Sequence, residues 1–385
     1  MIIPTRDRCE TLGPALRTCL EQDYPNLQII VSDNCSTDAT AAVVAQYQAP
    51  NLTYLKTECR LSMADNFEFA LSHVDEGFVM FIGDDDGLLP DAVSYVASLQ
   101  QRTGLLAISG SNAEYCWPNF PDASRANALK WQTSRDRFDI RSCREWVNRC
   151  LTFREIYTFE MPKLYHGFVH KQVIDRARSD GRFFHSITPD AYSAFAIAFF
   201  VDEFVYSHRP FTIGGASGRS NGVSSMDAKG RSDESQKFLA ENTIEFHPAL
   251  TLCASLEVNM TEAYMKFAER FPALTAGYVP DWAVMLNSAL GSANARTRPE
   301  VEAAVQTMAL QHGVDLGERC LRYQGTRGLR AWSHLVRVAR SRFEGQRVAD
   351  ASVLGVTDVY EAAQFIQRAI DAVGASSRPA FRARS

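Results

Sequence analysis

The chain has 385 residues, of which 46% are hydrophobic and 22% charged, with a net charge of −5 and a pI near 5.9. This composition excludes wholesale disorder and suits either one large domain with an extension or two domains. The negative net charge argues against a nucleic-acid-binding protein, because phosphate contacts need a basic surface.

Several simple sequence features favour a cytoplasmic protein. The nine cysteines are scattered from Cys9 to Cys320 without a C-x-x-C pair, which predicts reduced, mostly buried thiols. Charged residues at positions 6–8 interrupt any apolar signal segment. The longest apolar run, 194–201, is far shorter than the ~20 residues of a membrane-spanning helix.

The first hundred or so residues alternate between apolar, β-branched runs and segments with helical periodicity. Strands are expected at 2–4, 27–31, 52–55, 77–82 and 105–108, with helices at 12–20, 36–48, 67–74 and 90–97. This alternation predicts an α/β fold with a Rossmann-like, doubly wound parallel sheet. Ligands of such sheets bind at the carboxyl ends of the strands.

The rest of the chain divides into two parts. An aromatic-rich stretch at 112–165 is followed by a strand at 166–170 and by two helices, one after residue 171 and one at 190–201. A second strand at 204–213 then leads into a loop rich in glycine and serine at 214–222. Beyond about residue 235 helices are expected near 237–270, 280–294, 299–312, 329–343 and 357–373. We therefore expect an α/β domain at 1–225, a helical domain at 226–373 and a disordered tail at 374–385.

Three consecutive carboxylates, Asp84, Asp85 and Asp86, follow the apolar strand at 77–82. Adjacent carboxylates repel one another unless a positive charge lies between them. Mg²⁺ and Mn²⁺ prefer oxygen ligands and are commonly bound by one or two carboxylates together with substrate phosphates. The cluster predicts such a metal site, and the alternative is a solvated acidic turn.

Three segments together resemble the successive signatures of the family 2 glycosyltransferases, which have the GT-A fold. They are IIPTRDR at 2–8, VSDNCSTD at 31–38 and FIGDDD at 81–86, in the order and spacing of that family. The resemblance covers residues 1–225. It implies a nucleotide-sugar donor, with a UDP-sugar preferred, a Mn²⁺ or Mg²⁺ cofactor bound by a D-x-D motif, and inversion at the anomeric carbon.

The resemblance also implies roles for particular residues. Asp33 would accept a hydrogen bond from the base, and Asn66 would lie near the donor. Asp84 would contact the ribose and the metal, Asp86 would be the main metal ligand, and Asp85 would support them. The nucleotide pocket would be lined by Pro4, Thr5, Arg6 and Arg8. The alternatives are surface charge for the two arginines and a helix-start residue for Asn66.

Glycosyl transfer also needs a general base for the acceptor hydroxyl, on the face of the sugar opposite the leaving diphosphate. Asp190, in Thr188-Pro189-Asp190, precedes an apolar helix and is the best candidate. The alternative interpretation of Asp190 is a plain helix cap.

The glycine-rich loop at 214–222 permits close approach of the backbone to phosphate. Within it, Ser217, Arg219 and Ser220 could donate hydrogen bonds to the donor diphosphate; the alternative is a connector between domains. His208, just before the loop, is a candidate metal or phosphate ligand, although a lone histidine is more often structural. His166 and His170 are weaker candidates.

The segment 319–347 carries eight arginines and one acid, with apolar residues on one helical face. This pattern describes either a helix on an anionic membrane surface, which would suit a lipid-linked acceptor, or a core-facing helix with a solvated basic back. We favour the second interpretation.

The sequence thus predicts an inverting glycosyltransferase that acts on a saccharide or lipid-linked saccharide in surface polysaccharide assembly. A metal-dependent phosphohydrolase and a non-catalytic carbohydrate-binding or scaffold protein are the alternatives. The donor sugar, the acceptor and the oligomeric state stay open.

Overall fold

The computed structural model describes residues 1–133, 136–155, 157–220, 240–316 and 346–376. The strands are β1 (Ile2–Thr5), β2 (Ile29–Asp33), β3 (Leu52–Lys56), β4 (Phe78–Val79), β5 (Gly87–Leu88), β6 (Ala107–Cys116), β7 (Ala128–Gln132), β8 (Phe138–Ser142), β9 (Phe168–His170), β10 (Glu203–Ala216) and β11 (Gln346–Asp350). The helices are α1 (Cys9–Leu20), α2 (Thr40–Val44), α3 (Met63–Leu71), α4 (Ala92–Thr103), α5 (Cys143–Leu151), η1 (Thr158–Glu160), α6 (Lys171–Arg176), α7 (Pro189–Phe200), α10 (Leu256–Arg270), α11 (Pro272–Thr275), α12 (Trp282–Ser292), α13 (Arg298–His312) and α16 (Val359–Ser376).

The first three strands form a parallel sheet in the order β1-β2-β3. Residues 80–82 continue this sheet beside β1, since the amide of Ile2 donates to the carbonyl of Met80 at 2.8 Å. On its other side, Phe81 forms a parallel bridge with Tyr165. This bridge places residues 80–82, which directly precede the acidic cluster, next to residues 164–166.

The second sheet is mixed and is built around the long strand β10. β10 pairs in parallel with β6 and antiparallel with β5 and β8. At one edge of this sheet β6 pairs with β7 and β7 pairs with β11, and both pairs are antiparallel. The expected parallel sheet is therefore present in the first half of the α/β region, whereas the second half contains antiparallel pairs made by short returning segments.

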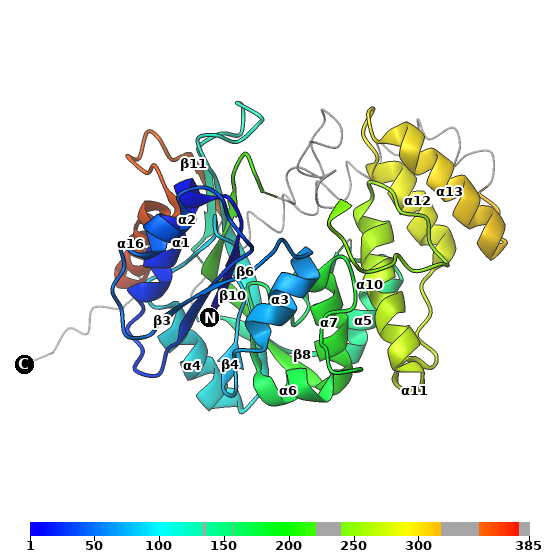
Figure 1. The fold of residues 1–385 in the computed structure, drawn as a ribbon, viewed down its shortest axis with the longest axis horizontal. Coiled ribbons are helices and arrows are strands. Elements are labelled where there is room, and N and C mark those ends of the chain that lie inside the picture. The colour runs from blue at the N-terminus through cyan, green and yellow to red at the C-terminus, as the bar shows by residue number, and fades with distance from the viewer. Residues whose placement is uncertain (134–135, 156, 221–239, 317–345, 377–385) are drawn as a thin grey trace, which may run out of the picture.

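Helices cover both faces of the strands, as Figure 1 shows with α1, α2 and α16 on one side and α3, α5 and α7 on the other. Successive residues of a strand point to opposite faces. Accordingly, Ile2 and Phe81 pack in the core with α3 and α7, whereas Ile3 and Ile82 pack in the core with α1 and α4. The α/β fold class expected from the sequence is confirmed, including a C-terminal part that is largely helical.

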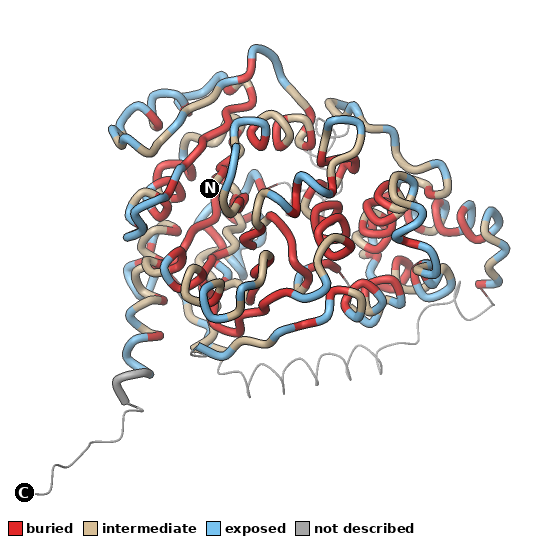
Figure 2. Tube along the Cα trace, turned by 90° about the horizontal axis from the view of Figure 1, so that it is seen from below, coloured by how far each residue is buried: buried red, intermediate tan, exposed pale blue. Residues whose placement is uncertain are grey.

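The C-terminal helices divide between two places. α10 packs along α7, and α12 and α13 form their own apolar core beyond it. α16 instead returns to the first region, where its buried face meets α1 and β5. Figure 2 shows the buried residues gathered where these helices face their neighbours. The domain boundaries stay predictions, although residues 346–376 pack against the α/β region.

Several expected element limits were wrong. The helix expected at 237–270 is helical from Leu256 on, because Ser255 caps it by accepting from the amide of Val258. The loop expected at 214–222 begins later, since β10 runs to Ala216 while pairing with β6. β11 was not expected at all. The helix expected at 329–343 lies outside the described residues.

Two chain-wide expectations concern thiols and membrane segments. Eight of the nine cysteines are described as free thiols, and five of these are buried. Among the described residues, every helix is either too short or too polar to cross a bilayer.

Candidate active site

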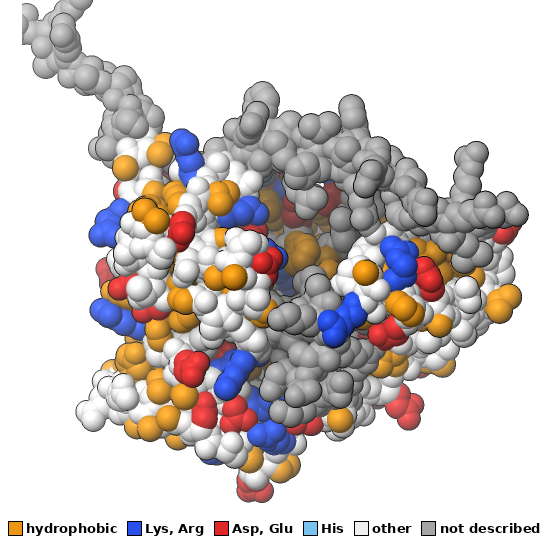
Figure 3. Space-filling model, turned by 90° about the horizontal axis from the view of Figure 1, so that it is seen from above, with side chains coloured by type: hydrophobic (Ala, Val, Ile, Leu, Met, Phe, Trp, Pro, Cys, Tyr) orange, Lys and Arg blue, Asp and Glu red, His pale blue; other side chains and the backbone are white. Residues whose placement is uncertain are grey.

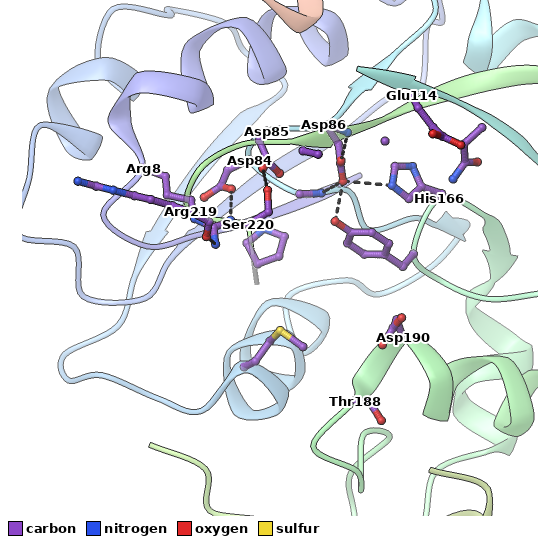
Figure 4. Close-up of a pocket in the computed structure, with 18 of the residues that line it drawn as sticks. Arg8, Asp84, Asp85, Asp86, Glu114, His166, Thr188, Asp190, Arg219 and Ser220 are labelled. Atoms are coloured by element: carbon purple, nitrogen blue, oxygen red, sulfur yellow. Dashed lines mark hydrogen bonds and ion pairs between the residues drawn. The ribbon is translucent and has the colours of Figure 1, made fainter. Parts of the chain in front are cut away.

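A cavity of about 1360 Å³ opens at the carboxyl ends of the strands, between the α/β region and the start of α10. Figure 3 shows this side of the molecule hollowed near its centre, with acidic, basic and apolar side chains in view. One wall is formed by the loop after β1, the acidic turn and the end of β10. The other wall is formed by residues around η1, the start of α7 and the start of α10. Figure 4 shows Asp84, Asp85 and Asp86 on one side and Asp190 on the other.

Asp84 is held by the loop after β1. Its carboxylate accepts a hydrogen bond of 2.6 Å from the Thr5 hydroxyl and forms an ion pair of 2.9 Å with Arg8. Burial disfavours the charged form of Arg8, but the neighbouring Asp84 and Asp85 carboxylates raise the pKa of its guanidinium. The loop after β1 and the acidic turn are thus joined by these contacts of Thr5 and Arg8 with Asp84.

Asp85 points toward the end of β10. Its Oδ2 accepts hydrogen bonds from the backbone amide and hydroxyl of Ser217 and from the hydroxyl of Ser220. Burial, followed by repulsion from Asp86, raises the pKa of Asp85. Asp85 therefore ties the acidic turn to residues 217–220.

Asp86 is surrounded by four donors. The amides of Gly83 and Gly215 donate at 2.6 and 2.7 Å, and the Tyr165 hydroxyl donates at 2.6 Å. His166 Nε2 lies 3.1 Å from Asp86 Oδ2. Burial acts to raise the pKa of Asp86, but the contact with His166 and these hydrogen bonds lower it overall. The pKa of Asp86 is thus lowered, whereas that of Asp85 is raised.

The close approach of β10 to the acidic turn requires a glycine at position 215. A Cβ atom there would lie 1.7 Å from the carbonyl oxygen of Asp85. The same approach allows the Gly215 amide to reach Asp86. The glycines of this segment therefore permit a backbone contact with the turn.

Four arginines line the wall around the loop after β1. Arg6 and Arg60 both pair with Glu241, and Arg60 also pairs with Asp7 at 2.8 Å. Arg219 donates to the carbonyl of Asp7 at 2.8 Å. Arg8 pairs with the acidic turn itself through Asp84, so the four arginines give this wall of the cavity basic groups that suit an anionic ligand.

Asp190 lies in the first turn of α7, after Pro189 at the first helical position. The helix cap is Thr188, and Asp190 Oδ2 instead accepts a hydrogen bond of 3.0 Å from Tyr157. Burial, followed by the Asp190 charge, raises the pKa of Tyr157 well above its ordinary value, so this tyrosine stays a donor. Burial lowers the pKa of nearby Lys163 to about 8, although Asp190 opposes this effect.

The structure brings most of the sequence-predicted residues into this one cavity. Asn66 lies in the first turns of α3, where its side chain bonds with Ser32. Its neighbour at the helix start, Ser62, provides the cap. The predicted residues in the lining are Pro4, Thr5, Arg6, Arg8, Asn66, Asp84, Asp85, Asp86, Asp190, Arg219 and Ser220.

Three predicted residues lie outside the lining. Asp33 is fully buried, where it accepts from the Ser36 amide and the Tyr54 hydroxyl; the next residue, Asn34, faces the cavity instead. Ser217 is buried behind Asp85. His208, expected as a metal ligand, is directed by β10 away from the acidic turn to Asp139 on β8, 2.6 Å away.

The histidine beside the acidic turn is His166. Sequence patterns made His166 only a weak candidate, because its position beside Asp86 depends on the bridge between Phe81 and Tyr165, which are 84 positions apart. Tyr157, Lys163 and Tyr165 were missed for the same reason. The aromatic-rich character of 112–165 was the one signal that pointed toward this part of the chain.

Comparison with known proteins finds a family model that matches the first part of the chain. Residues 1–157 match the model of glycosyl transferase family 2. A stretch of 97 residues is 34% identical to the GalNAc(5)-diNAcBac-PP-undecaprenol beta-1,3-glucosyltransferase of Campylobacter jejuni, covering 24% of this chain and 31% of that protein. A stretch of 91 residues is 34% identical to an uncharacterized protein of Mycobacterium tuberculosis, covering 24% and 28%. The chain thus spans less than a third of the length of these two relatives.

Solved structures were matched over most of the chain. TarS 1–349 of S. aureus, in complex with UDP-GlcNAc, is 15% identical with a TM-score of 0.43, covering 81% of this chain and 86% of that chain. The mannosyltransferase PcManGT of Pyrobaculum calidifontis, in complex with GDP-Man and Mn²⁺, is 15% identical with a TM-score of 0.38, covering 83% and 84%. The family resemblance expected from the three motifs is confirmed by the match of residues 1–157 to the model of glycosyl transferase family 2.

Proposed function

We propose that this protein is an inverting glycosyltransferase that moves a sugar from a nucleoside-diphosphate sugar, with UDP as the favoured nucleotide, to a saccharide or lipid-linked saccharide acceptor. One observation carries the proposal. A single cavity holds an acidic turn and four arginines on one wall and a carboxylate at a helix start on the other. These two walls match the two halves of the reaction.

The wall around the acidic turn suits the donor. Arg8, Arg60 and Arg219 supply positive charge for a diphosphate, and the loop after β1 together with Asn34 and Asn66 would border the base and ribose. As the bond between the anomeric carbon and the diphosphate breaks, negative charge grows on the leaving group. Fixed positive charge nearby stabilises that change.

A divalent cation fits beside Asp86. Described side chains provide no cluster of three or more metal ligands, but one or two carboxylates plus substrate phosphates are enough for Mg²⁺ or Mn²⁺. In the structure Asp86 Oδ2 and His166 Nε2 contact each other at 3.1 Å, and a cation bound by both would replace that contact. A nitrogen ligand favours Mn²⁺ over Mg²⁺. The ion would act as a Lewis acid on the leaving diphosphate, with Asp84 on its ribose side.

The opposite wall suits proton removal from the acceptor. The acceptor hydroxyl oxygen bonds to the anomeric carbon while the diphosphate leaves from the other face, which inverts the configuration. The hydroxyl proton passes to Asp190. Tyr157 holds one oxygen of that carboxylate at 3.0 Å, and the other accepts no hydrogen bond from the described residues, so it can take the proton.

The acceptor class rests on the relative from Campylobacter jejuni, whose name describes transfer of glucose onto an undecaprenol-diphosphate-linked saccharide. A similar acceptor here would suit a role in surface polysaccharide assembly at the cytoplasmic face of a membrane. Membrane contact through 319–347 stays a prediction, because residues 317–345 lie outside the described part of the chain.

A thermal-shift screen tests the proposal. UDP, GDP, ADP and CDP would be added with Mn²⁺, with Mg²⁺ or with EDTA, because a ligand that binds the folded state raises the melting temperature. We expect one nucleotide, UDP first, to stabilise the protein in a metal-dependent way. If no nucleotide does so, the proposal fails.

The same preparation separates the two alternatives. Phosphatase activity on a simple phosphomonoester without nucleotide binding would identify a phosphohydrolase. Glycan binding that is insensitive to metal and nucleotide would identify a carbohydrate-binding protein. Slow metal-dependent hydrolysis of a nucleotide sugar would support the glycosyltransferase.

A further inference from the structure

The first turn of α10 forms part of the cavity wall, although it lies beyond the region that matches the family. Leu256 and Asn259 both line the cavity. The Thr188 hydroxyl donates to the backbone carbonyl of Asn259 at 3.4 Å. Because Thr188 lies two residues before Asp190, this turn of α10 contacts the segment that carries Asp190. The helical extension therefore reaches the side of the cavity where the proposed base lies.

The side chain of Asn259 has unmet hydrogen-bonding capacity. Its Oδ1 atom is shut off from solvent and has no hydrogen-bond partner among the described residues. A buried polar group without a partner is costly, so such a group calls for an explanation. A ligand hydroxyl both donates and accepts, and it would satisfy the amide in either of its two orientations.

A second feature flanks Asp190 on the side of η1. Phe159 lines the same cavity and leaves 59% of its surface exposed, so part of its ring is open to a ligand. Its ring lies 4.9 Å from that of Tyr157, which bonds to Asp190. An exposed ring on one side and an unpaired amide on the other suit a ligand with an apolar C–H face and a rim of hydroxyls, which describes a pyranose.

The position of α10 relative to Asp190 is fixed by buried hydrogen bonds. Ser186, four residues before Asp190, donates to Glu262 on α10, and the amide of Thr188 donates to the Ser186 hydroxyl at 3.1 Å. Both Ser186 and Glu262 are fully buried. The loop that carries Asp190 is therefore built onto α10, and a ligand held by Asn259 would be held in a fixed relation to the base.

We propose that Asn259 and Phe159 form the saccharide acceptor subsite: Phe159 stacks against the C–H face of the acceptor pyranose, and the Asn259 amide binds one of its hydroxyls beside Asp190. This inference rests on the proposed function and deepens it, because it assigns acceptor recognition to the helical extension and to the segment around η1.

The test uses the full chain and simple glycosides as probes. Binding of methyl β-glucoside, methyl β-galactoside and methyl N-acetyl-β-glucosaminide would be measured by ligand-observed NMR, with and without UDP and Mn²⁺. We expect Asn259→Ala, Asn259→Leu and Phe159→Ala to weaken binding of the preferred glycoside roughly three- to tenfold, the usual effect of losing one hydrogen bond or contact. Asn259→Leu keeps the volume of the side chain, so a loss of packing would not explain a common effect of both Asn259 variants.

The controls locate the effect. Asn287→Ala changes an asparagine on α12 outside the cavity lining and should leave glycoside binding unchanged. Nucleotide binding and the slow hydrolysis of the donor by water should stay within about twofold in all variants, because neither uses the acceptor subsite. If the wild-type protein binds none of the three glycosides, or if the Asn259 and Phe159 variants bind them as well as the wild type, the subsite assignment is wrong.

Failure of the inference and failure of the proposed function give different results. Nucleotide binding and donor hydrolysis with unaltered glycoside binding in the variants would overturn the subsite alone. Glycoside binding lost in the variants, with no nucleotide binding in any protein, would overturn the transferase proposal and leave a saccharide site.

Discussion

The two walls of the cavity differ in how their side chains are held. On the donor wall, Asp84, Asp85 and Asp86 each accept at least two hydrogen bonds or ion pairs from the protein. On the acceptor wall, Asp190 accepts one, the Asn259 oxygen accepts none from the described residues, and Phe159 is largely exposed. The donor wall is preorganised for a charged diphosphate. On the acceptor wall, polar atoms of Asp190 and Asn259 keep hydrogen-bonding positions that a ligand can fill.

This difference follows the charges of the two substrates. A diphosphate in a partly buried site needs fixed dipoles and cations, since an unpaired buried charge is strongly unfavourable. A neutral sugar needs only hydroxyl partners and an apolar face. If the comparison is right, variants on one wall should affect one half of the reaction and spare the other.

The largest expected effect is on the acceptor wall. Asp190→Asn should lower the rate of transfer by roughly 10²–10⁴-fold, because it removes the proposed general base. Nucleotide-induced thermal stabilisation should stay unchanged, since Asp190 lies away from the acidic turn. Rates with a glycoside acceptor and melting temperatures with UDP and Mn²⁺ would check this. Loss of nucleotide binding in this variant would break the separation of the two walls.

Asp86→Ala should have the next largest effect, confined to the donor wall. We expect metal-dependent nucleotide affinity to fall by at least roughly 10–100-fold, because that is the usual effect of losing even a group that only orients a metal ligand. Isothermal titration with UDP and Mn²⁺ measures this. His208→Ala is the matched control, because His208 pairs with Asp139 and lies outside the cavity lining. An equal loss in the His208 variant would restore the metal role that the sequence suggested for it.

Gly215→Ala tests the contact between β10 and the acidic turn. The added Cβ would meet the Asp85 carbonyl at 1.7 Å, so the turn or the strand must move. We expect a loss of about 1–3 kcal/mol in the free energy of unfolding by denaturant titration. At Gly214 the nearest atom would be 3.8 Å away, so Gly214→Ala should lose far less. Similar losses in both variants would mean that the close approach is not what constrains the segment.

The smallest expected effect is a pH-dependent change in stability at Glu262, the residue of α10 that accepts from Ser186. Burial raises the pKa of Glu262 to about 7, although Ser186, Lys266 and Arg270 oppose this. Between its ordinary pKa and about 7, the folded protein binds a proton that the unfolded chain releases, so stability is lost as the pH rises through about 7.

Glu262→Gln cannot ionise and should avoid that loss. Its free energy of unfolding should match the wild type near pH ~5 and exceed it by about 1–3 kcal/mol near pH ~8. Glu269→Gln, at a largely exposed position on the same helix, is the control and should show no such pH-dependent difference. A constant difference across this range would show that ionisation of Glu262 is not the cause.

How well the sequence predicted the site depended on the distance between partners in the chain. The acidic turn and the loop after β1 were expected together, because each follows a strand of one parallel sheet. Asp33 was placed correctly at a strand end, yet its carboxylate turns to Ser36 and Tyr54 rather than to the cavity. The direction of a side chain at a strand end depends on local donors that periodicity does not reveal.

Apart from Asp190, the acceptor wall could not be derived in this way. Its residues come from 157–163, 188–190 and 256–259, and they meet only because α7 packs against α10. The return of α16 to the α/β region, and the pairing of β11 with β7, are equally invisible to local patterns.

The amino-acid sequence by itself therefore determined the alternating α/β elements, the three donor-side motifs and the family resemblance of residues 1–157. The periodicity of apolar residues and the residues that directly follow strands are properties of neighbours in the chain. Only the tertiary structure decided that His166 rather than His208 lies beside Asp86, and that a turn of the helical extension borders Asp190. Those contacts depend on which faces pack together, and packing is decided by the shapes and apolar surfaces of whole elements rather than by spacing along the chain.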